Sequence, residues 1–408
     1  MQSNHYDIVV VGGGMVGAAL ACALGNSALK VAVLEQSLPA TPTPDYDLRV
    51  SAISLASQAL FENVSAWPRM LARRVAPVRE MQIWDAGGSG SIHFNAAEIG
   101  EACLAWIVEN NVIQAALHER LHQYTNINYL CPAEVQTLNL TDTGATVMLK
   151  NGSTLQARLI VGADGADSLV RHAAHIQTQS LNLKQKGIVA TVTTEKPHTQ
   201  AARQRFLATG PLAFLPLTDA HTCSIVWSAD SARADELLML DDATFIATLQ
   251  KAFGKSLGTL QTVGPRAAFP LTLTHANSYT TTRLALIGDA AHTVHPLAGQ
   301  GVNLGFLDAA ALAEVLLDAV VRHKDIGAHS VLRRYERWRK AENFSMVAIT
   351  GGFRYLFGND IPGLSQLRNL GLNAADAATP LKNFIMRRAS GVNGDLPKLS
   401  RRREHAVP

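Results

Sequence analysis

Four residues near the N-terminus have the types and spacing that bind the diphosphate and ribose of a dinucleotide. Gly12, Gly14 and Gly17 follow the pattern G-x-G-x-x-G, and Glu35 lies further along the chain. Gly12 permits a tight turn, Gly14 lets the backbone approach a pyrophosphate, and Gly17 allows a helix to pack closely on a strand. The Glu35 carboxylate is placed to accept hydrogen bonds from a ribose hydroxyl.

The elements expected around these residues are those of a nucleotide-binding βαβ unit. Residues 8–11 form a continuous apolar run, which predicts a buried parallel strand. Residues 15–24 predict a helix whose N-terminus offers free N–H groups to phosphates, and residues 31–35 predict the next strand. A tight turn in an ordinary α/β domain is the alternative, but here all the parts occur in order. The acid at residue 35 disfavours a 2′-phosphate, so we expect FAD or NAD(H) rather than NADP(H) at this site.

Two further glycine–acid motifs lie far from the first. Asp164 and Gly165 follow an apolar run that predicts a strand, and a simple Asp-Gly turn is the alternative there. Asp289 follows another predicted strand, residues 283–287, and precedes a glycine-rich loop and a long predicted helix, residues 302–321. The N-terminus of that helix can stabilise negative charge, as on the pyrimidine side of a reduced flavin.

With these three motifs, the chain closely resembles the flavoprotein aromatic hydroxylases of the para-hydroxybenzoate hydroxylase-like family. The resemblance implies FAD bound by all three segments, with the Asp289 carboxylate on the ribityl chain and residues 296–303 against the flavin ring. It implies that Asp164, Gly165 and Arg171 serve both FAD and the nicotinamide reductant. The full set of cofactor contacts expected from the motifs and the resemblance is Gly12, Gly14, Gly17, Glu35, Arg49, Asn110, Gln114, Asp164, Gly165, Asp289, Gly299, Gly301, Val302 and Asn303.

Three longer stretches are similar to the ubiquinone-biosynthesis hydroxylases of that family, and most of all to the 2-polyprenylphenol 6-hydroxylase branch. They are residues 49–54, 292–306 and 332–337, and the resemblance extends over nearly the whole chain. It implies an FAD-dependent monooxygenase that hydroxylates the ring of a polyprenylphenol, using O₂ and NADPH or NADH, through a C4a-hydroperoxyflavin. For Arg49, a solvated surface position is the alternative to a flavin contact.

Four other functions remain as alternatives to hydroxylation of a polyprenylphenol at that ring carbon. Sister enzymes act at another ring carbon, and others act on a soluble aromatic compound. A flavin reductase of prenyl chains shares the fold, and a non-enzymatic FAD-binding scaffold of the ubiquinone assembly is an option from another class.

Few residues suggest direct chemistry on the substrate. His295 and Pro296 lie beside the expected flavin edge and are the catalytic candidates, with a hydrogen-bonded loop histidine as the alternative for His295. His292 and His295 lack a third ligand in sequence, so we expect no metal site. Phe214, Pro216 and Trp227 are candidates for the substrate pocket, with ordinary core packing as the alternative.

We expect a mixed α/β fold with a Rossmann-like FAD-binding domain, an inserted β-sheet substrate domain and C-terminal helices. The FAD-binding domain should be discontinuous because its motifs are dispersed. Within the insert, residues 78–85 and 91–94 alternate like two strands around a glycine-rich hairpin turn. The expected parts are an FAD-binding domain of residues 1–75, 100–180 and 276–325, a substrate domain of residues 76–99 and 181–275, and a helical region with a tail, residues 326–408. We expect the tail around Arg401 to be mobile.

Composition narrows the class of protein. With 408 residues, 47% of them hydrophobic and 17% charged, the chain is long enough for two globular domains. A net charge of +3 does not indicate a nucleic-acid partner. We expect neither a membrane-spanning helix, since no apolar run reaches ~18 residues, nor a secretory signal. Four cysteines without C-x-x-C spacing predict small buried side chains in a reducing compartment, and hence a cytoplasmic location.

The polyprenylphenol that the resemblance implies would reside in a membrane. We therefore expect a protein that is peripheral to the inner membrane, or one that receives its substrate from other ubiquinone-biosynthesis proteins. A homo-oligomer is a further expectation for its assembly. Phe353, Leu356 and Phe357, with Arg354, could form an apolar and basic membrane contact, and core packing of that helix is the alternative.

Overall fold

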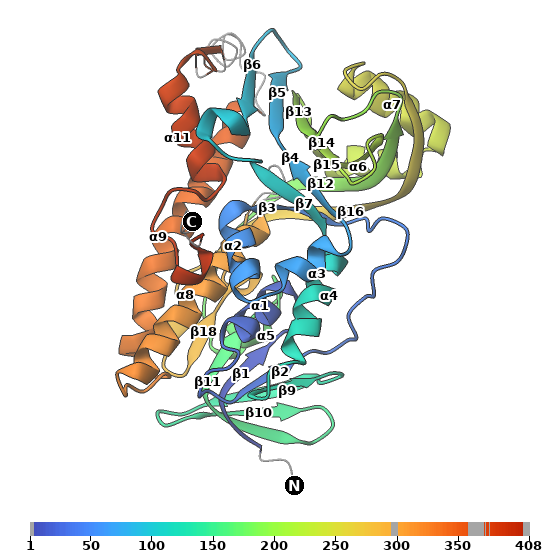
Figure 1. Ribbon diagram of the computed structural model, residues 1–408. Helices are drawn as coiled ribbons and strands as arrows, with labels where there is room; N and C mark the ends of the chain where they lie inside the picture. The colour runs from blue at the N-terminus through green and yellow to red at the C-terminus, as the bar shows by residue number, and fades with distance from the viewer. Residues whose placement is uncertain (1–3, 295–300, 358–370, 372, 375, 403–408) are drawn as a thin grey trace.

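The computed structural model describes residues 4–294, 301–357, 371, 373–374 and 376–402, and the side chains of residues 345–357 lie outside this description. The fold is mixed α/β, as the sequence predicts (Figure 1). One sheet lies at the end of the molecule where the chain starts, a second lies at the opposite end, and a small third sheet lies between them.

The first sheet has eight strands, in the order β17-β18-β11-β1-β2-β8, with β10 pairing with both β11 and β9. The apolar runs of β1 and β2 are buried in parallel pairing, which confirms the two strands predicted around the glycine motif. The strands are β1 (His5–Val11), β2 (Val31–Leu34), β8 (Ile127–Leu130), β9 (Val135–Leu140), β10 (Ala145–Leu149), β11 (Thr154–Gly162), β17 (Thr280–Thr281) and β18 (Leu284–Leu286).

The carboxyl ends of β1, β11 and β18 lie together because these three strands are parallel neighbours. Val11 is opposite Gly162, and Gly162 is opposite Leu286. The Ala163 N–H donates to the Val11 carbonyl at 2.8 Å, and the Ile287 N–H donates to the Gly162 carbonyl at 3.0 Å. This pairing brings three motifs that are far apart in the sequence to one edge of the sheet.

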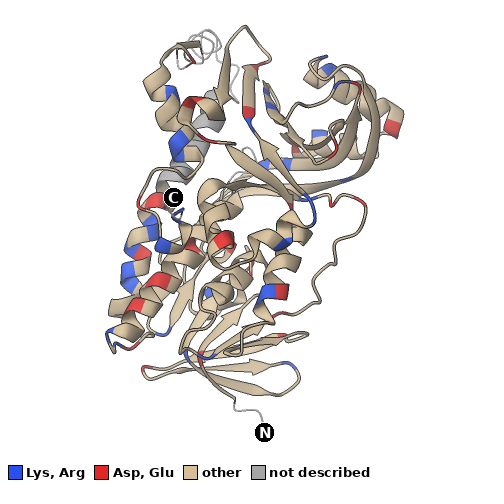
Figure 2. Cartoon of the chain, in the orientation of Figure 1, with Lys and Arg blue, Asp and Glu red and all other residues tan. Residues whose placement is uncertain are grey.

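Helices pack around this edge. The long α8 packs against both α1 and α9, and α1 also packs against α4. A Cβ on Gly305 of α8 would lie 2.8 Å from a methyl carbon of Val16 in α1, so glycine is needed for this approach. Charged residues of both signs are interspersed along α9 (Figure 2). The helices are α1 (Met15–Ala23), α2 (Leu55–Asn63), α3 (Trp67–Leu71), α4 (Asn110–Leu121), α5 (Leu169–Ala173), the short η2 (Gly288–Ala290), α8 (Gly301–Val321) and α9 (His329–Phe357).

The second sheet also has eight strands, in the order β19-β16-β12-β15-β14-β13-β5-β6. Phe214 of β14 stacks on Phe253 of α7 with ring centroids 3.7 Å apart, and Trp227 of β15 packs against Phe245 of α7. Phe214 and Trp227 are therefore core residues, as the alternative interpretation predicts, and do not line a substrate pocket. The elements are β5 (Glu80–Asp85), β6 (Ser91–Asn95), β12 (Thr178–Thr194), β13 (Ala201–Leu207), β14 (Gly210–Pro216), β15 (Thr222–Asp230), β16 (Leu260–Ala276), β19 (His292–Thr293), α6 (Ser231–Met239) and α7 (Asp242–Phe253).

A three-stranded sheet, in the order β3-β7-β4, lies between the two larger ones. The strand predicted over residues 78–85 is in fact divided at Arg79, because Val78 ends β4 in this sheet whereas Glu80 begins β5 in the second sheet. The hairpin itself is confirmed, since β5 and β6 pair antiparallel. The elements are β3 (Val50–Ser54), β4 (Val75–Val78), β7 (Ala105–Glu109) and the short η1 (Ala96–Ile99).

The C-terminal segment contains α11 (Thr379–Ala389) and the short η4 (Lys398–Ser400). The expectation of a mobile tail is wrong for its first residues, because hydrogen bonds hold them. Asn63 donates to the carbonyls of Leu399 and Arg401 at 2.9 and 3.3 Å, and Arg402 pairs with Glu101.

The cysteines are free thiols in the structure. Cys22, Cys103 and Cys223 are buried as predicted, and burial raises the pKa of each thiol, to about 12, about 11 and about 12 respectively. Cys131 is only half-buried. Within the described part of the chain, every helix is too short or too polar to cross a membrane.

Candidate active site

The glycine turn after β1 has the close contacts that the motif requires. A Cβ on Gly12, whose φ is +103°, would lie 2.3 Å from the Ala163 carbonyl oxygen. A Cβ on Gly17 would lie 2.0 Å from the Gly12 carbonyl oxygen. The position of a Gly14 Cβ is different, because it faces open space. Gly14 is also the N-cap of α1 and offers no side-chain cap to its N–H groups. An uncapped helix N-terminus beside open space suits a pyrophosphate.

The backbone N–H and the backbone carbonyl of Gly13 are both hydrogen-bonded to side chains. The N–H donates to Glu35 Oε2 at 2.9 Å, and the carbonyl lies 2.7 Å from Nε2 of His118 in α4. Burial lowers the pKa of His118, so the neutral ring donates its N–H to this carbonyl. Sequence reasoning missed His118, because no motif connects it with a glycine turn that lies 105 residues away.

Glu35, the expected ribose acceptor, also has a structural role. In addition to the Gly13 bond, its Oε1 accepts a hydrogen bond from the Ser37 N–H at 3.2 Å. Each carboxylate oxygen has more than one lone pair. A ribose hydroxyl could therefore still bind, and this contact stays a prediction.

Asp164 in the second motif is bonded within its own turn. Its Oδ1 accepts from the Ser168 hydroxyl at 2.5 Å, and its Oδ2 accepts from the Val170 N–H at 3.1 Å. Buried Arg171 donates to the Ala290 carbonyl at 2.9 Å and so ties this motif to the third one. Gly165, whose φ is +84°, has open space at its Cβ position. The turn thus has both an internal framework and an open side.

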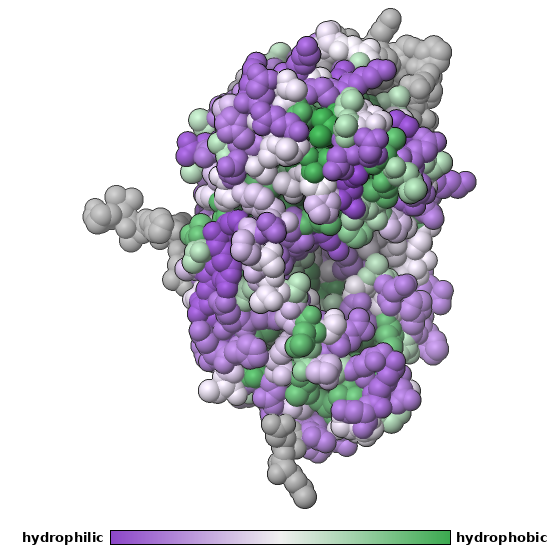
Figure 3. Space-filling view, turned by 90° about the vertical axis from the view of Figure 1, so that its right-hand side faces the viewer, coloured by the Kyte–Doolittle hydropathy of each residue, from purple (hydrophilic) through white to green (hydrophobic). Residues whose placement is uncertain are grey.

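Asp289 in the third motif is accessible to solvent, yet protein surrounds it closely. Its loss of solvation raises the pKa of the carboxyl group, while His292 and Arg49 act in the opposite direction. A side chain that is both accessible and surrounded lies in a concave part of the surface. Arg49 is exposed, as the surface alternative expects, but its guanidinium also lies 4.8 Å from the ring centroid of Phe269 in β16. Figure 3 shows a face of the molecule that is hollowed midway along its length.

Asn303 in the first turn of α8 is fixed by β3. Its Nδ2 donates to the Ala52 carbonyl at 2.7 Å, and its Oδ1 accepts from the Ser54 N–H at 2.9 Å. Its side chain is buried, so it acts as a clamp between α8 and the small sheet. Gly301 begins α8, and Val302 packs against the main core. His295, Pro296 and Gly299 lie outside the described residues, so the two catalytic candidates and that cofactor contact stay predictions.

The two candidates at the start of α4 differ. Asn110 Oδ1 accepts from the Ser51 hydroxyl at 2.7 Å, which couples α4 to β3. Gln114 lies one turn further and is half-buried. Its amide has no hydrogen-bond partner among the described residues, which leaves it free for a ligand.

A buried polar cluster lies directly behind the third motif, with Asp308 of α8 at its centre. Asp308 Oδ2 lies 2.5 Å from Nε2 of His292 and accepts from the Gly288 N–H at 3.2 Å. Its Oδ1 accepts from Arg339 Nε at 2.9 Å and from Asn343 Nδ2 at 3.0 Å. All five groups are buried.

The electrostatics of this cluster favour an ionised Asp308. Burial alone would raise the pKa of its carboxyl group, but His292 and Arg339 outweigh burial and hold the pKa at about 2. A buried carboxylate with this many donors is held rigidly. Because Gly288 and His292 flank Asp289, the cluster fixes the backbone that carries Asp289. Sequence reasoning missed the cluster, since two of its members lie in α9, outside every motif.

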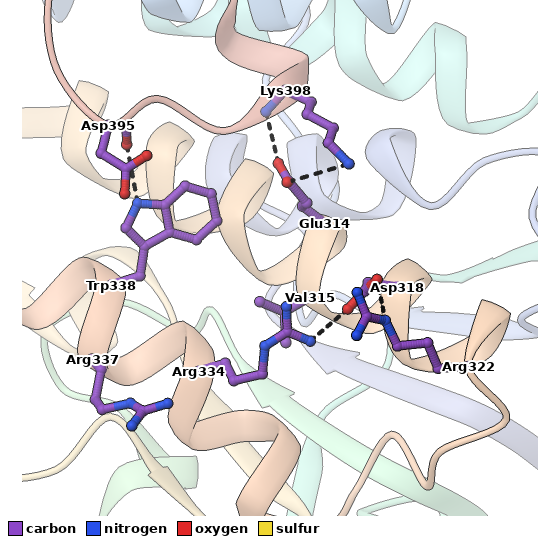
Figure 4. Close-up of a pocket in the computed structure, with 9 residues that line it drawn as sticks. All are labelled: Glu314, Val315, Asp318, Arg322, Arg334, Arg337, Trp338, Asp395 and Lys398. Carbon is purple, nitrogen blue, oxygen red and sulfur yellow. Dashed lines mark hydrogen bonds and ion pairs between the residues drawn. The ribbon is translucent and has the colours of Figure 1, made fainter.

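Several pockets lie away from the glycine motifs, and two of them adjoin helices of the C-terminal part of the chain. One, of about 530 Å³, lies between α8, α9 and the C-terminal segment (Figure 4). Its charged side chains pair mainly with one another: Asp318 binds Arg322 and Arg334, and Glu314 binds Lys398. Its lining contains no residue of the three motifs, and we assign it to anchoring the C-terminal segment.

The second pocket is an apolar cavity of about 90 Å³ at the junction of the second sheet, the small sheet and α11. It reaches Ala52, whose carbonyl accepts from Asn303 of the third motif. We call it the α11 cavity. It is lined by Ala52, Val78, Met81, Phe94, Leu104, Ala105, Ile107, Ala202, Leu215, Ile385, Met386, Ala389 and Ser390.

The motif residues fit FAD. The open space at Gly14 beside an uncapped helix N-terminus suits the diphosphate, and the accessible but surrounded Asp289 suits a hydroxylated chain. The described residues contain no group of three or more His, Cys, Asp or Glu side chains that could hold a metal ion. This arrangement is that of a flavin-binding oxidoreductase.

Comparisons with known proteins agree with this class. A family model described as an FAD binding domain matches residues 5–349. Ubiquinone hydroxylase UbiL of Rhodospirillum rubrum is 40% identical over 94% of this chain and 89% of its own length. The 3-demethoxyubiquinol 3-hydroxylase of Escherichia coli is 38% identical over 96% of this chain and its full length, 100%. The human ubiquinone biosynthesis monooxygenase COQ6, mitochondrial, is 36% identical, over 94% of this chain and 92% of its own length.

Solved structures show the same fold. The p-nitrophenol 4-monooxygenase PnpA of Pseudomonas putida has a TM-score of 0.78 at 19% identity, over 96% of this chain and 99% of that one. PqsL of Pseudomonas aeruginosa, in complex with 2-aminobenzoylacetate, has a TM-score of 0.77 at 21% identity, over 91% and 100%.

The protein is an FAD-dependent aromatic hydroxylase, and NAD(P)H is the reductant typical of such enzymes. The chain belongs to the ubiquinone-biosynthesis hydroxylase family, within the para-hydroxybenzoate hydroxylase-like flavoprotein monooxygenases.

Proposed function

We propose that this protein hydroxylates the aromatic ring of a polyprenylphenol, using O₂ and NADH or NADPH. The observation that carries the proposal is the position of the α11 cavity. An apolar cavity adjoins β3 at Ala52, and the same residue is hydrogen-bonded to Asn303 of the flavin motif. A ring bound near Asn303 could thus carry an apolar substituent away from the flavin.

The chain's own residues would hold the cofactor along one edge of the first sheet. Gly14 and the N-terminus of α1 bind the diphosphate, and Glu35 accepts from a ribose hydroxyl. Asp289 accepts from the ribityl chain, and Asp308 keeps its backbone in place through Gly288. When bound and reduced, FAD supplies the chemistry that activates O₂, and the protein positions the ring and excludes water.

Other expected contacts belong to the same proposal. Arg49, Gln114 and the first turn of α8 at Val302 and Asn303 would contact the flavin side, with Asn110 positioning α4. Asp164 and Gly165 would serve FAD and the reductant from the open side of their turn. His295 would influence the protonation of the phenol, and Pro296 would stiffen the loop beside the ring.

Hydroxylation at a different ring carbon is the second candidate. The Escherichia coli relative is named a 3-hydroxylase of 3-demethoxyubiquinol, and it aligns over its whole length. The first candidate takes a phenol that carries only the prenyl chain, whereas the second takes a later, more substituted ring.

Deletion of the gene, followed by mass spectrometry of the accumulated quinone precursor, tests the proposal. Accumulated polyprenylphenol supports the first candidate, and an accumulated demethoxy precursor supports the second. Unchanged quinone content contradicts both. Complementation with Asp289→Ala, which should weaken FAD binding, separates an enzyme from a scaffold, because a scaffold that does not use FAD in turnover would still restore quinone in full. Glu236→Ala, which removes an exposed ion pair with Arg233 in α6, away from the three motifs, is the matched control.

A further inference from the structure

The α11 cavity opens to solvent along one stripe of α11. Met386 closes the inner side and is buried, with 3% of its side chain exposed, whereas Ile385 and Ala389 line the cavity and are exposed. Residues four apart lie on the same face of a helix. Ile385 and Ala389 therefore form one side of the cavity's mouth.

Exposed apolar side chains of α11 lie beside this mouth. Leu381, Phe384 and Ile385 are 51%, 61% and 38% exposed, so three large apolar side chains face solvent within five residues of α11. Leu381 lies one turn before Ile385, in line with Ala389. The apolar surface thus continues from outside the protein, past Ile385, into the cavity.

Hydrogen bonds hold α11 at its edges, so the cavity has fixed walls. Asn383 and Arg387 donate to the carbonyls of Glu98 and Ile99 in η1 at 3.4 and 3.1 Å. The Ser390 carbonyl accepts from the Leu55 N–H at 2.9 Å, at the start of α2. Between these attachments, the side chains of Ile385, Met386 and Ala389 line the cavity.

The lining has almost no polar groups, which restricts what the cavity can bind. Twelve of its side chains are hydrocarbon or thioether, and Ser390 is the one hydroxyl. An apolar cavity of this kind stays dry and takes an apolar guest. Its inner end adjoins Ala52, which is bonded to the flavin motif. An apolar and narrow guest fits this cavity, with one end near Ala52 and the other near the exposed residues of α11.

We propose that the α11 cavity binds the isoprenoid chain of the substrate, and that the chain leaves the protein between Ile385 and Ala389 and lies along Leu381 and Phe384. This inference rests on the proposed function, because it assigns the cavity to the same substrate. It adds a binding site for the chain, made by α11, that is distinct from the residues that hold the flavin.

The test compares the wild-type holoenzyme with Ala389→Phe, which fills the mouth, and with Ile385→Asp, which places a charge there. The first measurement is the ratio of kcat/KM for a long-chain prenylphenol to that for a methyl-substituted phenol. We expect both variants to lower this ratio by at least about tenfold, roughly 1.4 kcal/mol. Met239→Phe, at an exposed apolar residue of α6, is the control and should leave the ratio unchanged. An unchanged ratio in both mouth variants would overturn the proposal.

A second measurement does not depend on turnover. Each FAD-loaded protein is titrated calorimetrically with the isoprenoid alcohol farnesol. We expect farnesol to bind the wild-type protein, and its Kd to be at least tenfold higher for both mouth variants. If no phenol is hydroxylated but farnesol binding behaves in this way, the chain site stands and the proposed function fails. If phenols are hydroxylated but farnesol binds all proteins equally, or none, the chain site is wrong and the proposed function stands. Because Ile385 and Ala389 are exposed, at least one variant should fold, as FAD absorbance would show.

Discussion

The polar cluster around Asp308 and the α11 cavity both adjoin the third flavin motif, the cluster at Gly288 and the cavity at Ala52, and they are built in opposite ways. In the cluster, Asp308 has four hydrogen-bonded partners and is held ionised. The cavity has almost no hydrogen-bonding groups and is not filled by its own side chains.

The two regions differ because one must hold a backbone segment in a defined position and the other must accept a flexible chain. Hydrogen bonds define position closely, which suits the backbone that carries Asp289. Apolar contact defines position loosely, which suits a flexible chain. The side chains that line the cavity leave it unfilled, so a bound chain would add apolar contacts there.

The largest effect should follow from Asp308→Ala. It leaves Arg339 and His292 buried beside each other without their carboxylate, which costs about 3–5 kcal/mol when one partner of a buried pair is removed. Denaturant unfolding of the apoprotein measures this loss. Asp318→Ala is the control on the same helix, since its ion pairs with Arg322 and Arg334 are exposed, and it should change stability little. Equal losses of unfolding free energy in the two variants would show that the buried cluster contributes no more to stability than an exposed ion pair.

The next effect concerns the binding of FAD. Asp289→Ala removes a carboxylate acceptor, and hydrogen bonds to charged groups contribute about 1.5–3 kcal/mol, so the Kd for FAD should rise by roughly 10- to 100-fold. The raised pKa of Asp289 means that its charged form is disfavoured in the apoprotein, and this penalty is present at pH values above that pKa. Removing the carboxyl group should therefore raise the Tm of the apoprotein near neutral pH. An unchanged Kd for FAD would contradict the place assigned to this carboxylate.

The contribution of Asp308 to the stability of the fold should be lost in acid. The pKa of Asp308 is about 2 in the folded protein against an ordinary value of 3.8. Its stabilisation is complete above pH 4 and is lost as the pH falls toward 2, a change of ~2 kcal/mol. Asp308→Asn should lack this component, so its stability relative to wild type should improve as the pH falls. Parallel stability curves for the two proteins would show that Asp308 does not titrate in this window.

The smallest effect should come from a conservative change in the cavity. Leu215→Met keeps volume and polarity, and such swaps usually change stability by less than ~1.5 kcal/mol. Asn343→Leu in the cluster is similar in size but leaves Arg339 without one acceptor, and it should cost clearly more. Thermal unfolding of both variants measures the contrast. A cavity variant as unstable as the cluster variant would remove the distinction between the regions.

The same contrast explains what the sequence could predict. The strands and glycines around Gly12 and Gly288 are local patterns, so the mixed α/β fold and the FAD motifs follow from the chain alone. The pairing of β1, β11 and β18 then brings the motifs together, as parallel neighbours must.

Other features depend on tertiary contacts that no local pattern encodes. His118 holds the Gly13 carbonyl from another helix, and Arg339 reaches Asp308 from 31 residues away. The break at Arg79 was missed because β4 and β5 read as one alternating run, although they join different sheets. Phe214 and Trp227 were candidates for the pocket, but α7 covers their face of the sheet, and small residues such as Ala52 and Ala202 line the cavity instead.

The most direct test of the account is turnover of a prenylphenol by the purified holoenzyme with NAD(P)H under oxygen-18 gas. Mass spectrometry of the product then shows the source of the new hydroxyl oxygen. We predict one labelled oxygen on the ring and no product when O₂ is excluded. Unlabelled hydroxylated product, or product formed without O₂, would contradict the assignment of this protein as a flavin-dependent hydroxylase of polyprenylphenols.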